Sequence, residues 1–427
     1  MIVGQSTLLI GYLFWILLFP NFYGVFDTRG AILLNLTIMV WPITYLFMNK
    51  KTLIITLNKN SITFKKMMVV PCYFIVAIPI GMMVGIIFND NKIIIRDFFE
   101  LHRPFYWIII FVTSYKFFLK GYDHPSIRKL LIAVFLTCVT MGLFQYFQIN
   151  FKFLSQYIKQ ENYYSLRIAA PFPNPYDYGF VMVFFSLYFL NFFLNTRNKM
   201  YFMLFAFSGI MILLTQSRSM FGAFALVNLF LVPVFSLFVF GSIMRGRLTK
   251  TDLLIFAIPL SVIFFGTLIL VNFEDNLKYL FAGFRKIAAN PLYNGVTSNR
   301  IDQLSEILAS IVKNPVTLLF GNGPAKGVLN DVESIYSYYL FRYGVCGLLI
   351  GFLLPALYAS KCSKMVAKTY QRRSPQYIFF RSLQLWFLAV PMISLANNHT
   401  EQIRVSALYI LLIGLVAARR DSLRGAT

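Results

Sequence analysis

Two carboxylates late in the chain lie where chemistry beside a membrane would need them. Asp331 and Glu333 follow the glycine turn 321–323 and stand directly before the long apolar segment 334–360. The start of a helix favours a negative charge, so it would help to keep Glu333 ionised. An ionised carboxylate can take the proton of an attacking hydroxyl group. The spacing therefore indicates either a general base at a bilayer surface or an anion that only begins a helix.

Three arginines beside other apolar segments add cationic groups. Arg167 comes before prolines that stiffen the start of an apolar segment, and Arg218 lies in a short connection between two such segments. Arg300 lies near the start of an amphipathic pattern. Because arginine binds phosphate oxygens through charged, often bidentate hydrogen bonds, these residues predict a phosphate-bearing ligand. The alternatives are a stiff turn at Arg167, a side chain reaching lipid headgroups at Arg218, and a packing helix at Arg300.

A fourth charged segment, Arg96–Pro104, carries Asp97, Glu100 and Arg103 among apolar residues. It indicates either an interfacial segment whose charges extend to water or a further part of a polar site. No phosphate-binding glycine loop, dinucleotide fingerprint or zinc-ligand spacing occurs in the sequence, so nucleotide chemistry has no support. The four cysteines show no pairing framework, and the three histidines are scattered.

The composition indicates that a membrane positions these residues. The chain has 427 residues, of which 58% are hydrophobic and only 13% are charged, whereas soluble domains carry about 25% charged residues. Continuous apolar runs are typical of spanning helices, while β-barrel strands would alternate. The sequence therefore predicts an all-α, polytopic integral membrane protein with about 12 transmembrane helices. The predicted spans are 3–22, 30–48, 67–88, 104–119, 129–147, 177–194, 200–215, 219–240, 252–272, 334–360, 376–395 and 403–418.

The distribution of charge predicts the orientation of these spans. An even number of spans puts both termini on one side, where the loops carry more than half of the 39 Lys and Arg residues. The acids on that side are Asp123, Asp252 and Asp421. Because basic loops face the cytoplasm, both termini are predicted to be cytoplasmic. The net charge of +23 then mostly reflects membrane orientation, and no nucleic-acid partner is predicted.

Two long loops lie on the predicted outer side of a single integral membrane domain, 1–427. They are a first large periplasmic loop, 148–176, and a second, 273–333. Apolar residues at three- and four-residue spacing in the second loop predict an amphipathic helix that begins near Ser298 and ends before Pro315. No internal repeat is visible, which disfavours a transporter built from similar halves.

Three pieces of the chain, within about residues 160–350, resemble the Wzy-type O-antigen polymerases, which share a family pattern with the O-antigen ligases. Their order and spacing match the family. One departure is that its Arg-x10-Gly stretches do not occur here with that spacing. The pieces are Arg167 with Pro173 and Asn174, Thr215 with Ser217 and Arg218, and Arg300 followed by Gly321-Asn322-Gly323 and ESIYSYYLFRYGVCG.

The resemblance implies a metal-independent, all-helical glycosyltransferase without a cofactor, at the periplasmic face of the bacterial inner membrane. Such enzymes move a growing glycan from undecaprenyl pyrophosphate onto the sugar of a newly arrived lipid-linked oligosaccharide. Polymerase-like chains carry an acid where Glu333 stands, which implies Glu333 as the base, supported by Asp331. Arg218, Arg300 and Arg167 would hold the pyrophosphate. Partners would be membrane lipids, and a chain-length regulator and flippase of the same pathway.

Two alternatives stay open at the level of sequence. An O-antigen ligase would transfer finished glycan to lipid A-core, and a lipid-linked oligosaccharide flippase would also have about twelve spans. Arg381, inside a predicted span, fits a transporter. Tyrosines near the loops would stack on sugars or anchor the membrane interface. These are Tyr163, Tyr164, Tyr176 and Tyr178.

Overall fold

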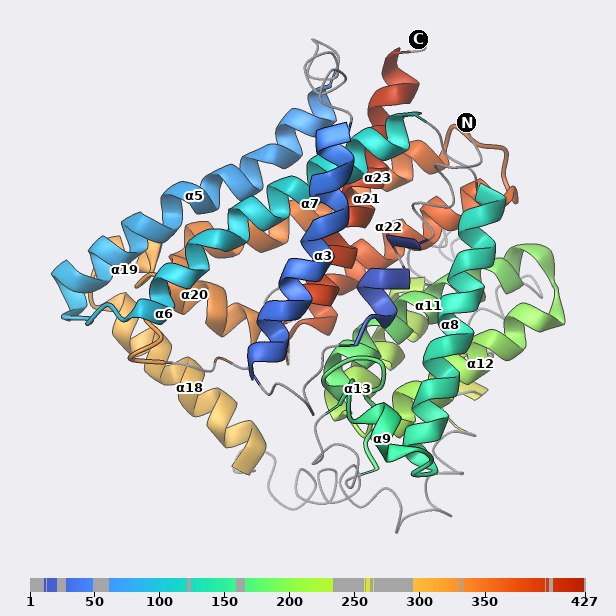
Figure 1. The fold of residues 1–427 in the computed structure, drawn as a ribbon, viewed down its shortest axis with the longest axis horizontal. Coiled ribbons are helices and arrows are strands. Elements are labelled where there is room, and N and C mark those ends of the chain that lie inside the picture. The colour runs from blue at the N-terminus through green and yellow to red at the C-terminus, as the bar shows by residue number, and fades with distance from the viewer. Residues whose placement is uncertain are drawn as a thin grey trace, which may run out of the picture. The chain divides into compact units, whose positions relative to one another are not determined.

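All regular secondary structure in the described part of the chain is helical. The computed structural model describes residues 11–12, 14–20, 28–48, 61–120, 124–158, 166–232, 257, 259–261, 264, 295–329, 332, 334–395, 397–398 and 402–425. Every regular element among these residues is a helix (Figure 1). Four of the described helices are long and apolar enough to cross a membrane, namely Ile62–Asn89, Pro125–Tyr146, Pro175–Thr196 and Ile335–Ala367.

The described helices coincide with most of the predicted spans. A helix satisfies its backbone hydrogen bonds within its own segment, so long apolar runs favour this structure. The predicted spans 3–22, 219–240 and 252–272 lie partly or mostly outside the described residues. The helices are α3 (Thr28–Met48), α5 (Ile62–Asn89), α7 (His102–Lys120), α8 (His124–Tyr146), α11 (Pro175–Thr196), α12 (Lys199–Leu214), α22 (Pro375–Ile393), α23 (Ile403–Gly425), and the continuous run α20 (Ile335–Cys346), η4 (Gly347–Leu353) and α21 (Leu354–Ala367).

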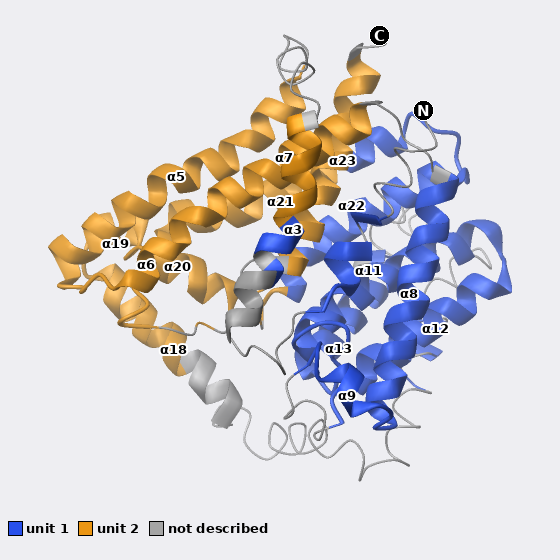
Figure 2. Cartoon of the chain, in the orientation of Figure 1, with its two compact units in different colours: residues 1–38, 123–285, 363–393 blue, residues 39–122, 286–362, 394–427 orange. Residues whose placement is uncertain are grey.

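The chain forms two compact units (Figure 2). Unit 1 consists of Met1–Ile38, Asp123–Arg285 and Ser363–Ile393. Unit 2 consists of Met39–Tyr122, Lys286–Cys362 and Ser394–Thr427. Two of the boundaries between the units fall within helices, namely α3 and α21.

Helix α11 packs against α12, α13 (Arg218–Leu226) and α22 in unit 1. Its aromatic side chains Phe180 and Phe184 meet Trp386 of α22 edge-on, with ring centroids 5.3 and 5.4 Å apart. Edge-to-face aromatic pairs of this kind stabilise a core beyond the area that they bury. At the start of α11 the Asn174 side chain accepts a hydrogen bond from the backbone N of Asp177 at 2.8 Å, so the helix start is capped.

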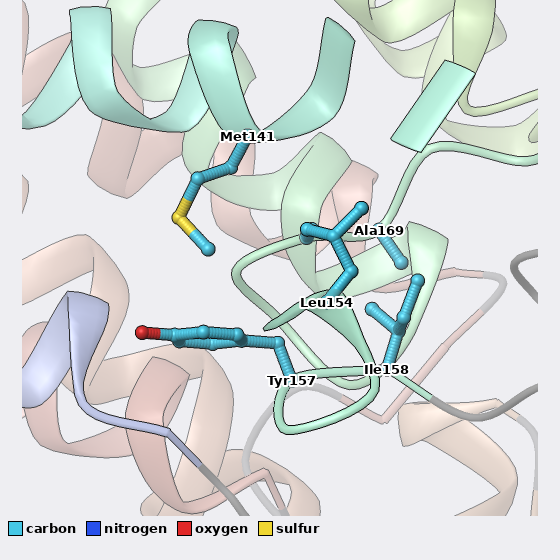
Figure 3. Packing of buried hydrophobic residues seen from close by; sticks show 6 residues of the cluster. Met141, Leu154, Tyr157, Ile158 and Ala169 are labelled. Atoms are coloured by element: carbon cyan, nitrogen blue, oxygen red, sulfur yellow. The ribbon is translucent and has the colours of Figure 1, made fainter. Parts of the chain in front are cut away.

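The described start of the first large loop folds back onto α8 in unit 1. The short helix α9 (Phe151–Leu154) follows α8, and residues after it bury apolar side chains against α8 and against the segment after Arg167 (Figure 3). This loop segment is therefore packed by hydrophobic burial. The cluster consists of Met141, Leu154, Tyr157, Ile158, Ala169 and Ala170.

Helices α5, α7 and α23 lie side by side in unit 2 (Figure 1). Asp421 of α23 is buried and accepts hydrogen bonds from the backbone N of Thr63 and of Phe64, each at 3.0 Å. It also accepts one from the Tyr115 hydroxyl at 3.0 Å. One carboxylate therefore caps the start of α5 and ties three helices together.

The glycine turn 321–323 follows α19 (Pro315–Phe320) and packs its backbone against α20 in unit 2. The backbone N of Asn322 donates to the Phe341 carbonyl oxygen at 2.9 Å. Gly344 has a φ of 63°, and a Cβ there would lie 2.4 Å from the carbonyl carbon of Leu319. The glycines of this motif therefore serve close backbone packing.

Helix α18 (Gly295–Val312) covers the segment for which the apolar spacing predicts an amphipathic helix. Ile307 and Ile311 are buried, whereas Leu308 and Val312 are exposed. The helix packs against α19 and α20 in unit 2. Only part of its apolar face is therefore covered within the described residues.

Candidate functional site

The five predicted site residues fall in different parts of the chain. Arg167 and Arg218 are described, and both belong to unit 1. Arg300 lies in α18 of unit 2, where the helix is described but this side chain is not. Asp331 and Glu333 lie outside the described residues. The described part of the site is therefore the pair Arg167 and Arg218.

One buried amide side chain holds the backbone around Arg167. Gln145, in the last turn of α8, is fully buried, and its Nε2 donates to the Arg167 carbonyl oxygen at 2.6 Å. Its Oε1 accepts from the backbone N of Ala169 at 2.7 Å and of Ala170 at 2.9 Å. An amide has both donors and acceptors, so it satisfies three backbone groups at once. Sequence reasoning missed Gln145, although a single amide near the end of the apolar segment 129–147 is a usable signal.

The segment that carries Arg167 is hydrogen-bonded to the turn before Arg218. The backbone N of Ile168 donates to the Leu214 carbonyl oxygen at 3.1 Å. The Arg167 Nε donates to the Thr215 carbonyl oxygen at 3.4 Å. The structure thus brings the segments that carry Arg167 and Arg218 together. We call residues 167–168 and 214–218 the arginine junction.

Arg218 is the first residue of α13 and is half-buried. The preceding Ser217 caps the helix, because its Oγ accepts from the backbone N of Met220 at 3.3 Å. The macrodipole makes a helix start an unfavourable place for a cation and a favourable place for an anion. The macrodipole and the Arg218 charge would therefore both attract a phosphate at this helix start.

An aromatic ring at the start of α11 contacts Arg167. The Arg167 guanidinium lies 5.7 Å from the centroid of the Tyr176 ring, within the range of a cation–π contact. Neither predicted role of Tyr178, sugar stacking or anchoring at the membrane interface, fits its position. It is fully buried, and its hydroxyl donates to the Cys138 carbonyl oxygen at 3.1 Å, so it is a core residue. Residues 163–164 lie outside the described part of the chain.

A second polar group in unit 2, which we call the ionic cluster, consists of Glu100, Arg103, Lys326 and Arg342. Glu100 is 1% exposed, its carboxylate lies 2.8 Å from the Arg103 Nε, and it forms an ion pair with the Lys326 ammonium. Arg103 also donates to the Tyr338 hydroxyl at 3.1 Å. The Arg342 guanidinium, 1% exposed, lies 4.4 Å from the centroid of the Tyr338 ring. The cluster therefore joins side chains far apart in the sequence.

Asp97 connects the same two parts of the chain through backbone groups. It lies in the short helix α6 (Ile95–Phe98), is 1% exposed, and accepts from the backbone N of Ile94 and of Lys326, each at 2.9 Å. Asp97 and Glu100 are thus buried. The interpretation of this segment as interfacial, with charges that extend to water, is wrong for both carboxylates.

Electrostatics keep Glu100 ionised. Burial alone would raise the pKa of Glu100, but the neighbouring Arg103, Lys326 and Arg342 outweigh burial and lower the pKa below its usual value. A carboxylate with a lowered pKa is a poor general base and a good partner for cations. Among the described residues, the ionic cluster and Asp97 together bring three cations and two carboxylates into one place.

The chain matches no model of a known protein family and no curated protein.

Proposed function

We propose that the protein is a glycosyltransferase that polymerises undecaprenyl-pyrophosphate-linked oligosaccharide units into O-antigen or a related surface polysaccharide. The main structural support for this proposal is the geometry of the arginine junction. It joins two arginine-bearing segments by backbone hydrogen bonds beside the start of α13. Guanidinium groups next to a helix start suit a pyrophosphate. The sequence resemblance supplies the type of reaction.

In the proposed reaction the hydroxyl oxygen of the acceptor sugar attacks the anomeric carbon of the donor glycan. The bond between that carbon and the pyrophosphate oxygen breaks, and undecaprenyl pyrophosphate leaves with the electron pair. Glu333 accepts the hydroxyl proton and later releases it to water. Asp331 orients the acceptor or supports Glu333. Arg218, Arg167 and Arg300 stabilise the charge that develops on the leaving group.

The proposal includes about 12 spans in the bacterial inner membrane, with both termini cytoplasmic and the reaction at the periplasmic face. The arrangement of unit 1 supports this topology. The end of α8, at Gln145, and the end of α12, at Leu214, both contact the Arg167 segment. The predicted topology puts these helix ends on the same outer side.

The proposal is tested by complementation of a bacterial strain that lacks its own O-antigen polymerase. Wild-type protein should restore long glycan chains, and Arg218→Ala and Glu333→Gln should each abolish them at normal protein level. The matched control is Lys199→Ala, because Lys199 is exposed and begins α12 at the opposite end from the arginine junction. Long chains from both Arg218→Ala and Glu333→Gln would show that the assignment is wrong.

The product separates this function from its two alternatives. A polymerase leaves long chains on the lipid carrier, whereas a ligase joins finished glycan to lipid A-core. A flippase would change neither glycan length nor its attachment, but only the side of the membrane on which single units accumulate. Arg381 is the residue that would favour a transporter. Its guanidinium donates a hydrogen bond to the Gln384 side-chain oxygen of the same helix. This local hydrogen bond supports a structural role for Arg381.

A further inference from the structure

Cations from three helices gather at the end of unit 2 where α5 begins and α23 ends (Figure 1). Asp421 of α23 joins these two helix ends, because it accepts hydrogen bonds from the backbone N of Thr63 and of Phe64. Helix α21 reaches the same place, since the Lys66 Nζ lies 5.8 Å from the centroid of the Tyr358 ring. We call the cations here the basic end of unit 2, and they are Lys65, Lys66, Lys361, Arg420 and Arg424.

The cations of α21 and α23 lie close to one another. Arg420 and Arg424 are both within electrostatic range of the Cys362 thiol. Lys361 precedes Cys362 and lies three residues beyond Tyr358, so it shares the face of α21 that Lys66 contacts. Because like charges repel at such range, this arrangement costs free energy unless an anion offsets it.

The described residues offer little negative charge to the basic end. The Asp421 carboxylate is buried, and it already accepts from two backbone N–H groups and from the Tyr115 hydroxyl. The three lysines are exposed, and within the described part of the chain neither they nor Arg420 form an ion pair. The Arg420 Nε is buried and has no hydrogen-bond partner among the described residues. Since buried donors are nearly always paired, this atom indicates an acceptor that comes from outside the protein.

An exposed apolar surface leads away from the basic end. It lies on α5 and on the run Ile335–Ala367, which are both long and apolar enough to cross a membrane. On α5, the exposed Val69 and Val76 follow Lys65 on the same face, one and three turns later. On α21, the exposed Leu357 precedes Lys361 by one turn. Apolar surface that ends in cations suits a lipid with acyl chains and an anionic head.

We propose that the basic end of unit 2 binds an anionic phospholipid, with its phosphodiester at Lys66 and Arg420 and its acyl chains against α5 and α21. The apolar surface beside the cations favours a lipid over an acidic protein. The predicted topology, with both termini cytoplasmic, puts this lipid in the cytoplasmic leaflet. No residue of the basic end takes part in the proposed polymerisation, so either proposal can fail without the other.

Native mass spectrometry of the full-length protein in detergent tests the proposal with two lipids. Phosphatidylglycerol and phosphatidylethanolamine of the same acyl chains differ in that only the first has a net negative charge. Each cation near an anionic head strengthens binding about fivefold, so wild type should bind phosphatidylglycerol about 25-fold more tightly. The double variant Lys66→Gln with Arg420→Gln should lose this preference and bind phosphatidylethanolamine as wild type does.

Two exposed cations of unit 1 give the matched control. Lys129→Gln with Lys199→Gln removes the same charge near the starts of α8 and α12, on the same predicted side of the membrane. This control should keep the wild-type preference for phosphatidylglycerol. If Arg420→Gln does not fold, Lys65→Gln with Lys66→Gln tests the same site, because both lysines are exposed.

Competition separates a lipid from other anions. Inorganic phosphate should leave phosphatidylglycerol bound, and displacement by it would overturn the proposal in favour of a free phosphate. Equal binding of the two lipids by wild type would also overturn it, and added binding of polyglutamate would then indicate an acidic protein partner. An equal loss of preference in the unit 1 control would show a general effect of positive charge and no site at the basic end.

Discussion

The two units hold their cations in different ways. In unit 1, Arg167 contacts a backbone carbonyl oxygen and an aromatic ring, and Arg218 stands at a helix start. In unit 2, Arg103 and Lys326 contact the buried carboxylate of Glu100. A carbonyl oxygen orients a cation without cancelling its charge, whereas a carboxylate neutralises it. We infer that the ionic cluster mainly holds unit 2 together, and that the arginine junction depends on hydrogen bonds to backbone groups.

The largest effect is expected when the ionic cluster loses its carboxylate. Glu100→Gln leaves the buried Arg342 and the partly exposed Arg103 and Lys326 without their anion, which should lower the free energy of unfolding by about 3–5 kcal/mol. Chemical denaturation in detergent micelles measures this change. The control Glu306→Gln alters an exposed carboxylate of α18 and should change stability little. Equal stability of the two variants would remove the distinction between the units.

Two glycine substitutions compare the close backbone packing of unit 2 with a position in unit 1 that has open space. Gly344→Ala forces a side chain into a positive φ and into contact with Leu319, which should cost about 2–4 kcal/mol. Gly222→Ala in α13 meets no atom within 4 Å and should stabilise the helix by up to about 1 kcal/mol. Thermal unfolding of the purified variants should therefore shift in opposite directions. A stabilising Gly344→Ala would contradict the backbone packing.

Gln145→Leu tests whether the arginine junction depends on its buried amide. The substitution leaves the backbone N of Ala169 and of Ala170 without their acceptor, which should cost about 2–3 kcal/mol. Because it also releases Arg167, glycan length should fall more than protein level. Gel analysis of glycan beside immunoblots measures both, and Gln371→Leu, at an exposed position, is the control. Full-length glycan at normal amounts from Gln145→Leu would show that Gln145 does not position Arg167.

The smallest effect is a dependence of stability on pH. The folded protein holds the pKa of Glu100 below its usual value of about 4.3. The ionised form therefore stabilises unit 2 above this pH, and the stabilisation is lost as the pH falls through the folded pKa. The unfolding temperature of wild type should exceed that of Glu100→Gln by the largest amount at neutral pH. This difference should become smaller below about pH 4. A gap that widens in acid would contradict this account of the ionic cluster.

The helices were the part most open to prediction from the sequence. Continuous apolar runs predict a span at 67–88, and α5 extends over Ile62–Asn89. The added residues lie near the ends, where polar side chains and the cap from Asp421 decide the boundary. A distant carboxylate as a cap carries no local signal, so the sequence pattern could not place that end.

The candidate site was predictable only in part. Arg167 and Arg218 could be selected because each charge lies beside an apolar segment, and the structure brings their segments together. The pairing of Glu100 with Lys326 was not predictable, since the partners are far apart in the sequence and either charge alone suits an exposed loop. Tyr178 failed as a sugar contact because its helix turns the ring into the core.

Glycan transfer by the purified protein in proteoliposomes tests the proposed polymerisation without other cell components. The substrates are undecaprenyl-pyrophosphate-linked oligosaccharide units without lipid A-core, and mass spectrometry follows the products. A polymerase should give carrier-linked glycans that grow by whole repeat units, and Arg218→Ala should give no growth. Single units that never lengthen in the presence of folded wild-type protein would contradict it, and so would undiminished lengthening by Arg218→Ala.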